Sequence, residues 1–279
     1  MSELHTLSAD VRLAGEEAGE GIPVVLLHGL TATRRYVVMG SRALERSGHR
    51  VIAYDARGHG RSGPAPTPGA YAYEDLSDDL TAVLDARGVD RAVLVGASMG
   101  AHTAICHVLD APERVAGLVV VTPSFDPRES PDADQLARWD ELSAGLRRGG
   151  VDGFVAAYGV PDVPVRWRET MRRVLRQRLA AHEHPDAVAD ALRAVPRSRP
   201  FEALEALKNV SVPTAVVASR DEADPDHPLA VGRAYAAHIA GARLVTEASG
   251  DSPLAWQGAR LSKLIADVAA RADRAEGQP

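Results

Sequence analysis

The residues best suited to chemistry surround Ser98, in the sequence Gly96-Ala97-Ser98-Met99-Gly100. The apolar run before Gly96 is typical of a strand, and the residues after Gly100 favour a helix, so the serine lies in a sharp strand-to-helix turn. Glycine on both sides permits a strained backbone and a close approach that larger residues would prevent. Such a turn exposes a hydroxyl at a helix N-terminus, and Ser98 is therefore the predicted nucleophile.

Four further stretches indicate the elements that must position this serine. They occur in the order 24–29, 51–62, 214–228 and 242–247, and each begins with an apolar strand-like run. With the serine turn, they resemble the α/β-hydrolase family over nearly the whole chain. The resemblance implies an α/β fold: a doubly wound, mostly parallel sheet with an inserted helical lid.

Two backbone amides are expected to stabilise negative charge on the substrate. The N–H of Met99 lies at the helix N-terminus, where aligned amides favour an anion. The resemblance implies the N–H of Leu30 as the second oxyanion donor. It also implies an acid beyond the strand that ends near Ser219, where Asp224 has the family's Asp-x-x-x-Pro spacing to Pro228 and Asp221 is the second candidate.

The general base is harder to identify from the sequence. The resemblance implies a histidine in a Gly-His pair after the last strand, but this chain has Gly250-Asp251 there, and its last histidine is His238. Asp251 occupies the approximate position of the missing histidine, and burial would be needed to make its carboxylate a useful base. The base is thus expected to be unconventional or missing, with these histidines as further candidates: His102 on the helix after Ser98, His227 beside the acid, and His182 and His184 on the lid.

Other reactive residue types have structural interpretations. By resemblance, His28 braces the oxyanion loop and His59 stabilises a turn, with Asp55 as a loop organiser near the same rim. Cys106 lies two helical turns beyond Ser98, and we expect it in the core.

Composition narrows the classes of function. The 279 residues suffice for one large domain with an insertion, and a formal net charge of −6 argues against nucleic-acid binding. We expect a weakly polar small-molecule substrate. One cysteine excludes an intrachain disulfide, and we expect no metal and no cofactor. No run resembles a signal peptide or could span a membrane, so a cytoplasmic location is expected. The oligomeric state is left open.

Strand and helix patterns divide the chain into a core, residues 1–122 and 209–279, and a helical lid, residues 123–208. Within the lid, proline punctuates helices predicted over 134–147, 166–181 and 186–194. Elsewhere we expect one edge strand over 4–14, a helix over 34–47, a closing helix over 254–271 and a frayed tail over 272–279.

Three functions are compatible with these residues. The first is a hydrolase of an ester, thioester or lactone that acts through Ser98. The second is a repurposed, nonhydrolytic lyase or cyclase that uses the same anion-binding amides. The third is a noncatalytic protein that holds a small ligand under the lid.

Overall fold

One sheet organises the chain, which the computed structural model describes over residues 2–129, 133–251, 254–256 and 258–276. Its described strands follow the order β1-β2-β4-β3-β5-β6-β7-β8. The bounds are β1 (Ser2–Ser8), β2 (Val11–Ala18), β3 (Ile22–Leu27), β4 (His49–Tyr54), β5 (Ala92–Ala97), β6 (Val115–Val121), β7 (Thr214–Val217) and β8 (Arg243–Val245). β1 and β2 pair antiparallel, β2 is antiparallel to β4, and the other pairs are parallel. The mostly parallel sheet predicted from the sequence is confirmed.

Helices cover both faces of the sheet, which explains why its central strands are apolar throughout. Leucine, isoleucine and valine side chains of α2 (Tyr73–Ala86), α3 (Met99–Asp110) and α7 (Leu229–His238) pack on one face. α1 (Ala43–Arg46) and α8 (Ala259–Glu276) pack on the other. Because β3, β5 and β7 are parallel, the loops after their carboxyl ends meet at one edge, where ligands bind in open α/β sheets.

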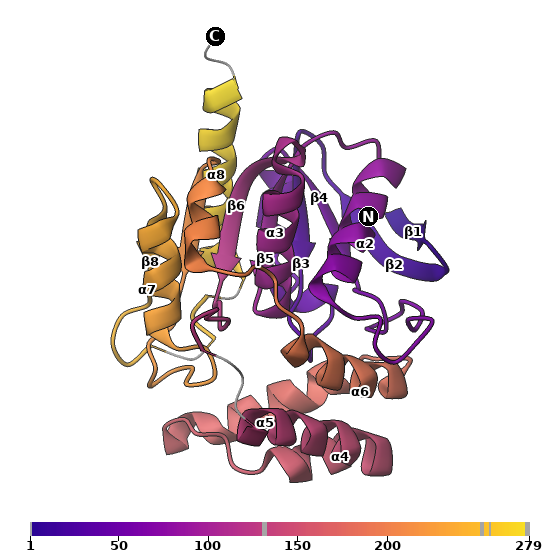
Figure 1. Ribbon diagram of the computed structural model, residues 1–279. Coiled ribbons are helices and arrows are strands. Elements are labelled where there is room, and N and C mark those ends of the chain that lie inside the picture. The colour runs from indigo at the N-terminus through magenta and orange to yellow at the C-terminus, as the bar shows by residue number, and fades with distance from the viewer. Residues whose placement is uncertain (1, 130–132, 252–253, 257, 277–279) are drawn as a thin grey trace.

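A helical insertion separates β6 from β7. It contains α4 (Ala133–Tyr158), α5 (Val165–Leu179) and α6 (Pro185–Ala194), followed by short 3-10 turns η3 (Val195–Arg197) and η4 (Leu204–Asn209). Figure 1 shows these three helices gathered beyond the end of the sheet to which β6 points. Apolar side chains of α4 and α6 share a core with Leu30 and Met99, so the insertion packs against the residues beside Ser98.

Several predicted boundaries need correction. The expected strand over 4–14 is a hairpin that turns at Ala9, where φ is +48°. The expected helix over 34–47 is reduced to η1 (Arg34–Tyr36) and α1, because Met39 and Gly40 adopt positive φ between them. η2 (Pro112–Arg114) leads into β6.

The helical boundaries also differ from those predicted. α4 continues past residue 147 as two helices joined across a kink at Gly149 and Gly150. α8 begins at Ala259, later than expected, and runs to Glu276, beyond the predicted end; residues 277–279 of the expected tail lie outside the described residues. Among the described residues, no helix combines the length and apolarity needed to cross a membrane.

Candidate active site

Ser98 lies in the turn between β5 and α3 with a strained backbone, φ 51° and ψ −113°. The flanking glycines are required by sterics. A Cβ on Gly96 would overlap the carbonyl of Gly100, and a Cβ on Gly100 would overlap the carbonyl of Leu27 on β3. Ser98 itself remains partly exposed. The packing of one strand and one helix therefore holds the hydroxyl in an accessible position.

The structure brings His227 and Asp224 to Ser98. The Oγ atom of Ser98 lies 2.9 Å from His227 Nε2, and His227 Nδ1 lies 2.9 Å from Asp224 Oδ1. With a proton on Nδ1, the imidazole donates to the carboxylate while Nε2 accepts from the serine hydroxyl. This is the geometry of a nucleophile, a base and an orienting acid. The acid and the histidine are three residues apart in the loop between β7 and α7.

Neighbouring contacts fix this loop at both ends. Asp221, the second candidate for the acid, accepts the N–H of Leu229 at 2.7 Å and so anchors the start of α7. On the other side, Tyr158 at the end of α4 donates to Asp226 at 3.2 Å. The loop that carries His227 is therefore attached both to the core and to the insertion.

The electrostatics of the loop make His227 a stronger base than a free imidazole. Burial lowers its pKa, but the charge and hydrogen bond of Asp224, with the charge of Asp226, raise it above the ordinary value of 6.5. Arg178 on α5 opposes this increase. His227 and Asp224 keep 22% and 25% of their side-chain surfaces exposed, so neither side chain is sealed from solvent.

The sequence predicts two backbone amides near Ser98 as oxyanion donors, those of Met99 and Leu30. The N–H groups of Met99 and Leu30 donate no hydrogen bond within the described part of the chain. Met99 is the first residue of α3. A Cβ on Gly29 would lie 3.5 Å from the Cβ of Ser98, which shows that the loop before Leu30 lies against the serine.

Imidazoles brace the loop that carries Leu30. Three successive carbonyl oxygens each contact a different ring: Gly29 with His28 at 2.9 Å, Leu30 with His59 at 2.8 Å, and Thr31 with His182 at 3.3 Å. His182 belongs to the insertion, and its Nδ1 accepts the N–H of Gly60 at 2.9 Å. Burial lowers the pKa of His182 to about 3, so the ring is neutral and can hold both contacts. The candidate base His182 is thus placed as a brace of the oxyanion loop.

Asp251 is not brought to Ser98. Its carboxylate accepts the N–H of Ala248 at 3.2 Å and pairs with Arg260 at 3.1 Å, and 39% of the side chain is exposed. The physical reason is local, because the loop after β8 turns tightly at Gly250 with φ 81°, and the carboxylate caps that turn. The structure therefore corrects the placement expected from the sequence.

His102 is also placed away from the serine hydroxyl. Its Nε2 atom accepts the N–H groups of Ser124 and Phe125 at 3.1 and 3.2 Å, and Nδ1 lies 3.1 Å from the hydroxyl of Tyr73. The ring is buried, and burial lowers its pKa to about 3. His102 therefore anchors the segment after β6. His184 directly precedes α6, and Cys106 is buried in the core.

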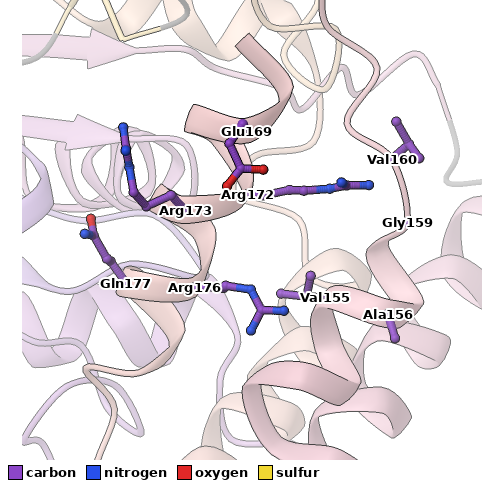
Figure 2. Close-up of a pocket in the computed structure, with 9 residues that line it drawn as sticks. All are labelled: Val155, Ala156, Gly159, Val160, Glu169, Arg172, Arg173, Arg176 and Gln177. Carbon is purple, nitrogen blue, oxygen red and sulfur yellow. The ribbon is translucent and has the colours of Figure 1, made fainter. Parts of the chain in front are cut away.

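A separate hollow lies between the end of α4 and α5, with a volume of about 640 Å³ (Figure 2). Figure 2 shows Arg172 and Arg176 reaching from α5 toward Val160 and Val155. None of its lining residues belongs to the Ser98 site. No group of three or more His, Cys, Asp or Glu suited to a metal ion occurs among the described residues.

Comparison with known proteins agrees with the geometry. The family model described as alpha/beta hydrolase fold matches residues 22–231. A putative carbamate hydrolase RutD of Variovorax paradoxus is 33% identical over 73% of this chain and 75% of its own length. A 2-hydroxy-6-oxononadienedioate/2-hydroxy-6-oxononatrienedioate hydrolase of Pseudomonas putida is 30% identical over 76% of each chain. Three further relatives are matched over less than half of their own lengths.

A solved structure covers nearly the whole chain. The malate-bound thermophilic esterase of Thermogutta terrifontis superposes with a TM-score of 0.81 at 25% identity, over 98% of this chain and 99% of the esterase. The residues matched by the family model include the serine turn, and the superposition covers nearly the whole chain. The chain therefore belongs to the alpha/beta hydrolase fold family, and it is a hydrolase.

Proposed function

We propose that the protein hydrolyses carboxylic esters, thioesters or lactones, with Ser98 as nucleophile, His227 as general base and Asp224 as the acid that orients it. The observation that carries the proposal is the pair of 2.9 Å contacts that joins these three side chains. The esterase named above and the putative carbamate hydrolase support a reaction at an acyl carbon bonded to a heteroatom.

The geometry suits a two-step acyl transfer. Ser98 Oγ attacks the carbonyl carbon while its proton passes to His227 Nε2, and Asp224 stabilises the resulting imidazolium. The N–H groups of Met99 and Leu30 receive the oxyanion. The tetrahedral intermediate expels the alcohol or thiol, which takes the proton from His227. Water then attacks the acyl-enzyme, gives its proton to His227, and Ser98 is released with that proton.

The insertion over residues 123–208 would act as a lid in this mechanism. Tyr158 and His182 link it to the triad loop and to the oxyanion loop, respectively. A lid in contact with both loops can exclude water and shape the space for the substrate.

The proposal is tested with p-nitrophenyl acetate and a fluorophosphonate probe. We expect turnover and rapid labelling in the wild type, and neither in Ser98→Ala. Ser249→Ala is the matched control, because that exposed serine contacts Glu222 and not the triad. Equal turnover in wild type and Ser98→Ala would refute the proposal. Ligand-induced thermal stabilisation without product would instead favour a binding protein, and rapid labelling of Ser98 would count against a nonhydrolytic enzyme.

A further inference from the structure

Arg178 on α5 is a cation without a complete set of partners. Its Nε atom is shielded from solvent and has no hydrogen-bond partner within the described part of the chain. The side chain is half-buried, and the centre of its guanidinium lies 5.5 Å from the centre of the Tyr36 ring. A shielded guanidinium N–H without an acceptor is unfavourable, so the arrangement favours binding of an anion that accepts its hydrogen bond.

The neighbours of Arg178 place it beside the catalytic groups. Tyr36 ends η1, which follows the loop that carries the oxyanion donor Leu30. The charge of Arg178 also interacts with Asp224 and His227 in the triad loop, and with Tyr158 at the end of α4. Arg178 therefore packs on Tyr36, close in sequence to the loop of Leu30, and its charge acts on the residues of the triad loop.

The protein's own carboxylates do not complete this site. Asp224 Oδ1 is occupied by His227, and Asp226 Oδ2 accepts from Tyr158. Burial lowers the pKa of Arg178 although the charge of Asp224 raises it, which indicates that the nearby negative charge compensates only in part. A planar guanidinium presents parallel N–H groups that match the two oxygens of a carboxylate. The nearby Asp224 and Asp226 would repel a dianion such as phosphate more strongly than a carboxylate.

We propose that Arg178 binds a carboxylate carried by the substrate, so that the preferred substrates are esters, thioesters or lactones with a free carboxylate. This inference rests on the proposed function and makes its substrate class more specific. It also replaces the weakly polar substrate expected from the net charge of the chain. The role of Arg178 is to bind and orient the substrate, while the bond-making groups remain Ser98 and His227.

Two pairs of esters test the proposal from both sides of the scissile bond. On the acyl side, mono-p-nitrophenyl adipate is compared with p-nitrophenyl hexanoate. On the alcohol side, 3-acetoxybenzoate is compared with 3-acetoxybenzamide. The measured quantity is the ratio of kcat/KM between the charged and the neutral member of each pair, after subtraction of spontaneous hydrolysis. Because both members meet the same base, a change in the pKa of His227 cancels in this ratio.

We expect the wild type to prefer the charged member of at least one pair, and Arg178→Met to lower that ratio roughly 10- to 100-fold, the range for a hydrogen bond to a charged group. Arg178→Lys should restore part of the preference. Arg173→Met is the matched control, because Arg173 is exposed on the same helix and lines the separate hollow shown in Figure 2. Its ratio should equal that of the wild type.

The two proposals fail in different ways. Ser98-dependent turnover with equal ratios in wild type and Arg178→Met would overturn the carboxylate site alone. Absence of Ser98-dependent turnover would overturn the proposed function, and calorimetric binding of the adipate and hexanoate esters to Ser98→Ala would then decide the carboxylate site. Tighter binding of the adipate ester that is lost in Ser98→Ala/Arg178→Met supports the site, and equal affinities refute it. If Arg178→Met fails to fold, Arg178→Lys and Arg178→Gln give the same comparison.

Discussion

Replacing His227 by glutamine separates the proposed base from Asp251, which occupies the sequence position where the family's histidine was expected. Glutamine fills much of the same space but cannot accept the proton of Ser98, so kcat should fall by roughly 10⁴ or more. At about 1.36 kcal/mol for each factor of ten, this loss is about 5 kcal/mol of transition-state stabilisation. KM should change little, because the proposed base acts on the proton of Ser98 and is not assigned to binding the substrate.

Asp251→Asn is the matched comparison. In the wild type, the carboxylate of Asp251 forms an ion pair with Arg260. The side chains of Asp251 and Arg260 are 39% and 44% exposed, and such surface pairs contribute about 0–1 kcal/mol to stability. We therefore expect wild-type kcat/KM from this variant. Both variants are assayed on p-nitrophenyl acetate, and their melting temperatures show that each is folded. Normal activity in His227→Gln combined with a large loss in Asp251→Asn would show that the base has been wrongly identified.

Three further predictions concern pH, sterics and the insertion. Because the pKa of His227 is raised, kcat/KM should fall with decreasing pH through a midpoint above 6.5. Asp226→Asn removes a negative charge that raises this pKa, so the midpoint should move to lower pH. pH–rate profiles of the wild type and the variant measure both midpoints, and equal midpoints would contradict the prediction. Gly100→Ala should destabilise the protein or prevent its folding, because the new Cβ would overlap the Leu27 carbonyl; a melting temperature equal to that of the wild type would argue against the steric requirement. His182→Ala should lower kcat roughly tenfold with KM nearly unchanged, because the brace on the oxyanion loop is lost, whereas a change in KM alone would point to substrate binding.

The sequence predicts the serine turn because its determinants are local. Gly96 and Gly100 are required by contacts with the next turn of the same chain segment and with one adjacent strand, and the strand-to-helix pattern is visible within a dozen residues. The helical insertion was predictable for a similar reason, since apolar strand patterns disappear after β6 and return at β7. In contrast, the glycine pair in α4 resembles a helix end but forms a kink inside a longer helical segment.

The proposed role of His227 was harder to predict because it depends on a turn. The sequence suggests Asp224 as the acid, but whether a histidine three residues later faces Ser98 depends on how residues 221–228 fold back over the end of β5. The N–H of His227 donates to the carbonyl of Asp224 at 3.2 Å, and in this closed turn Asp224 contacts His227 while His227 contacts the serine. The available signal was that, apart from His238, His227 is the only histidine after β7.

Because the proposed acid and base lie in one turn, the fold has to position fewer loops around Ser98. The separation between Asp224 and His227 is set by four consecutive residues, so only one loop has to be positioned against Ser98. That loop is held by Asp221 at the start of α7 and by Tyr158 from the insertion. The loop after β8 is then free for a structural task, in which the buried Glu247 accepts the N–H groups of Arg220 and the Trp256 indole at 2.6 and 3.0 Å. Because Tyr158 contacts the loop of the base and His182 contacts the oxyanion loop, a displacement of the insertion would disturb both halves of the proposed reaction at once.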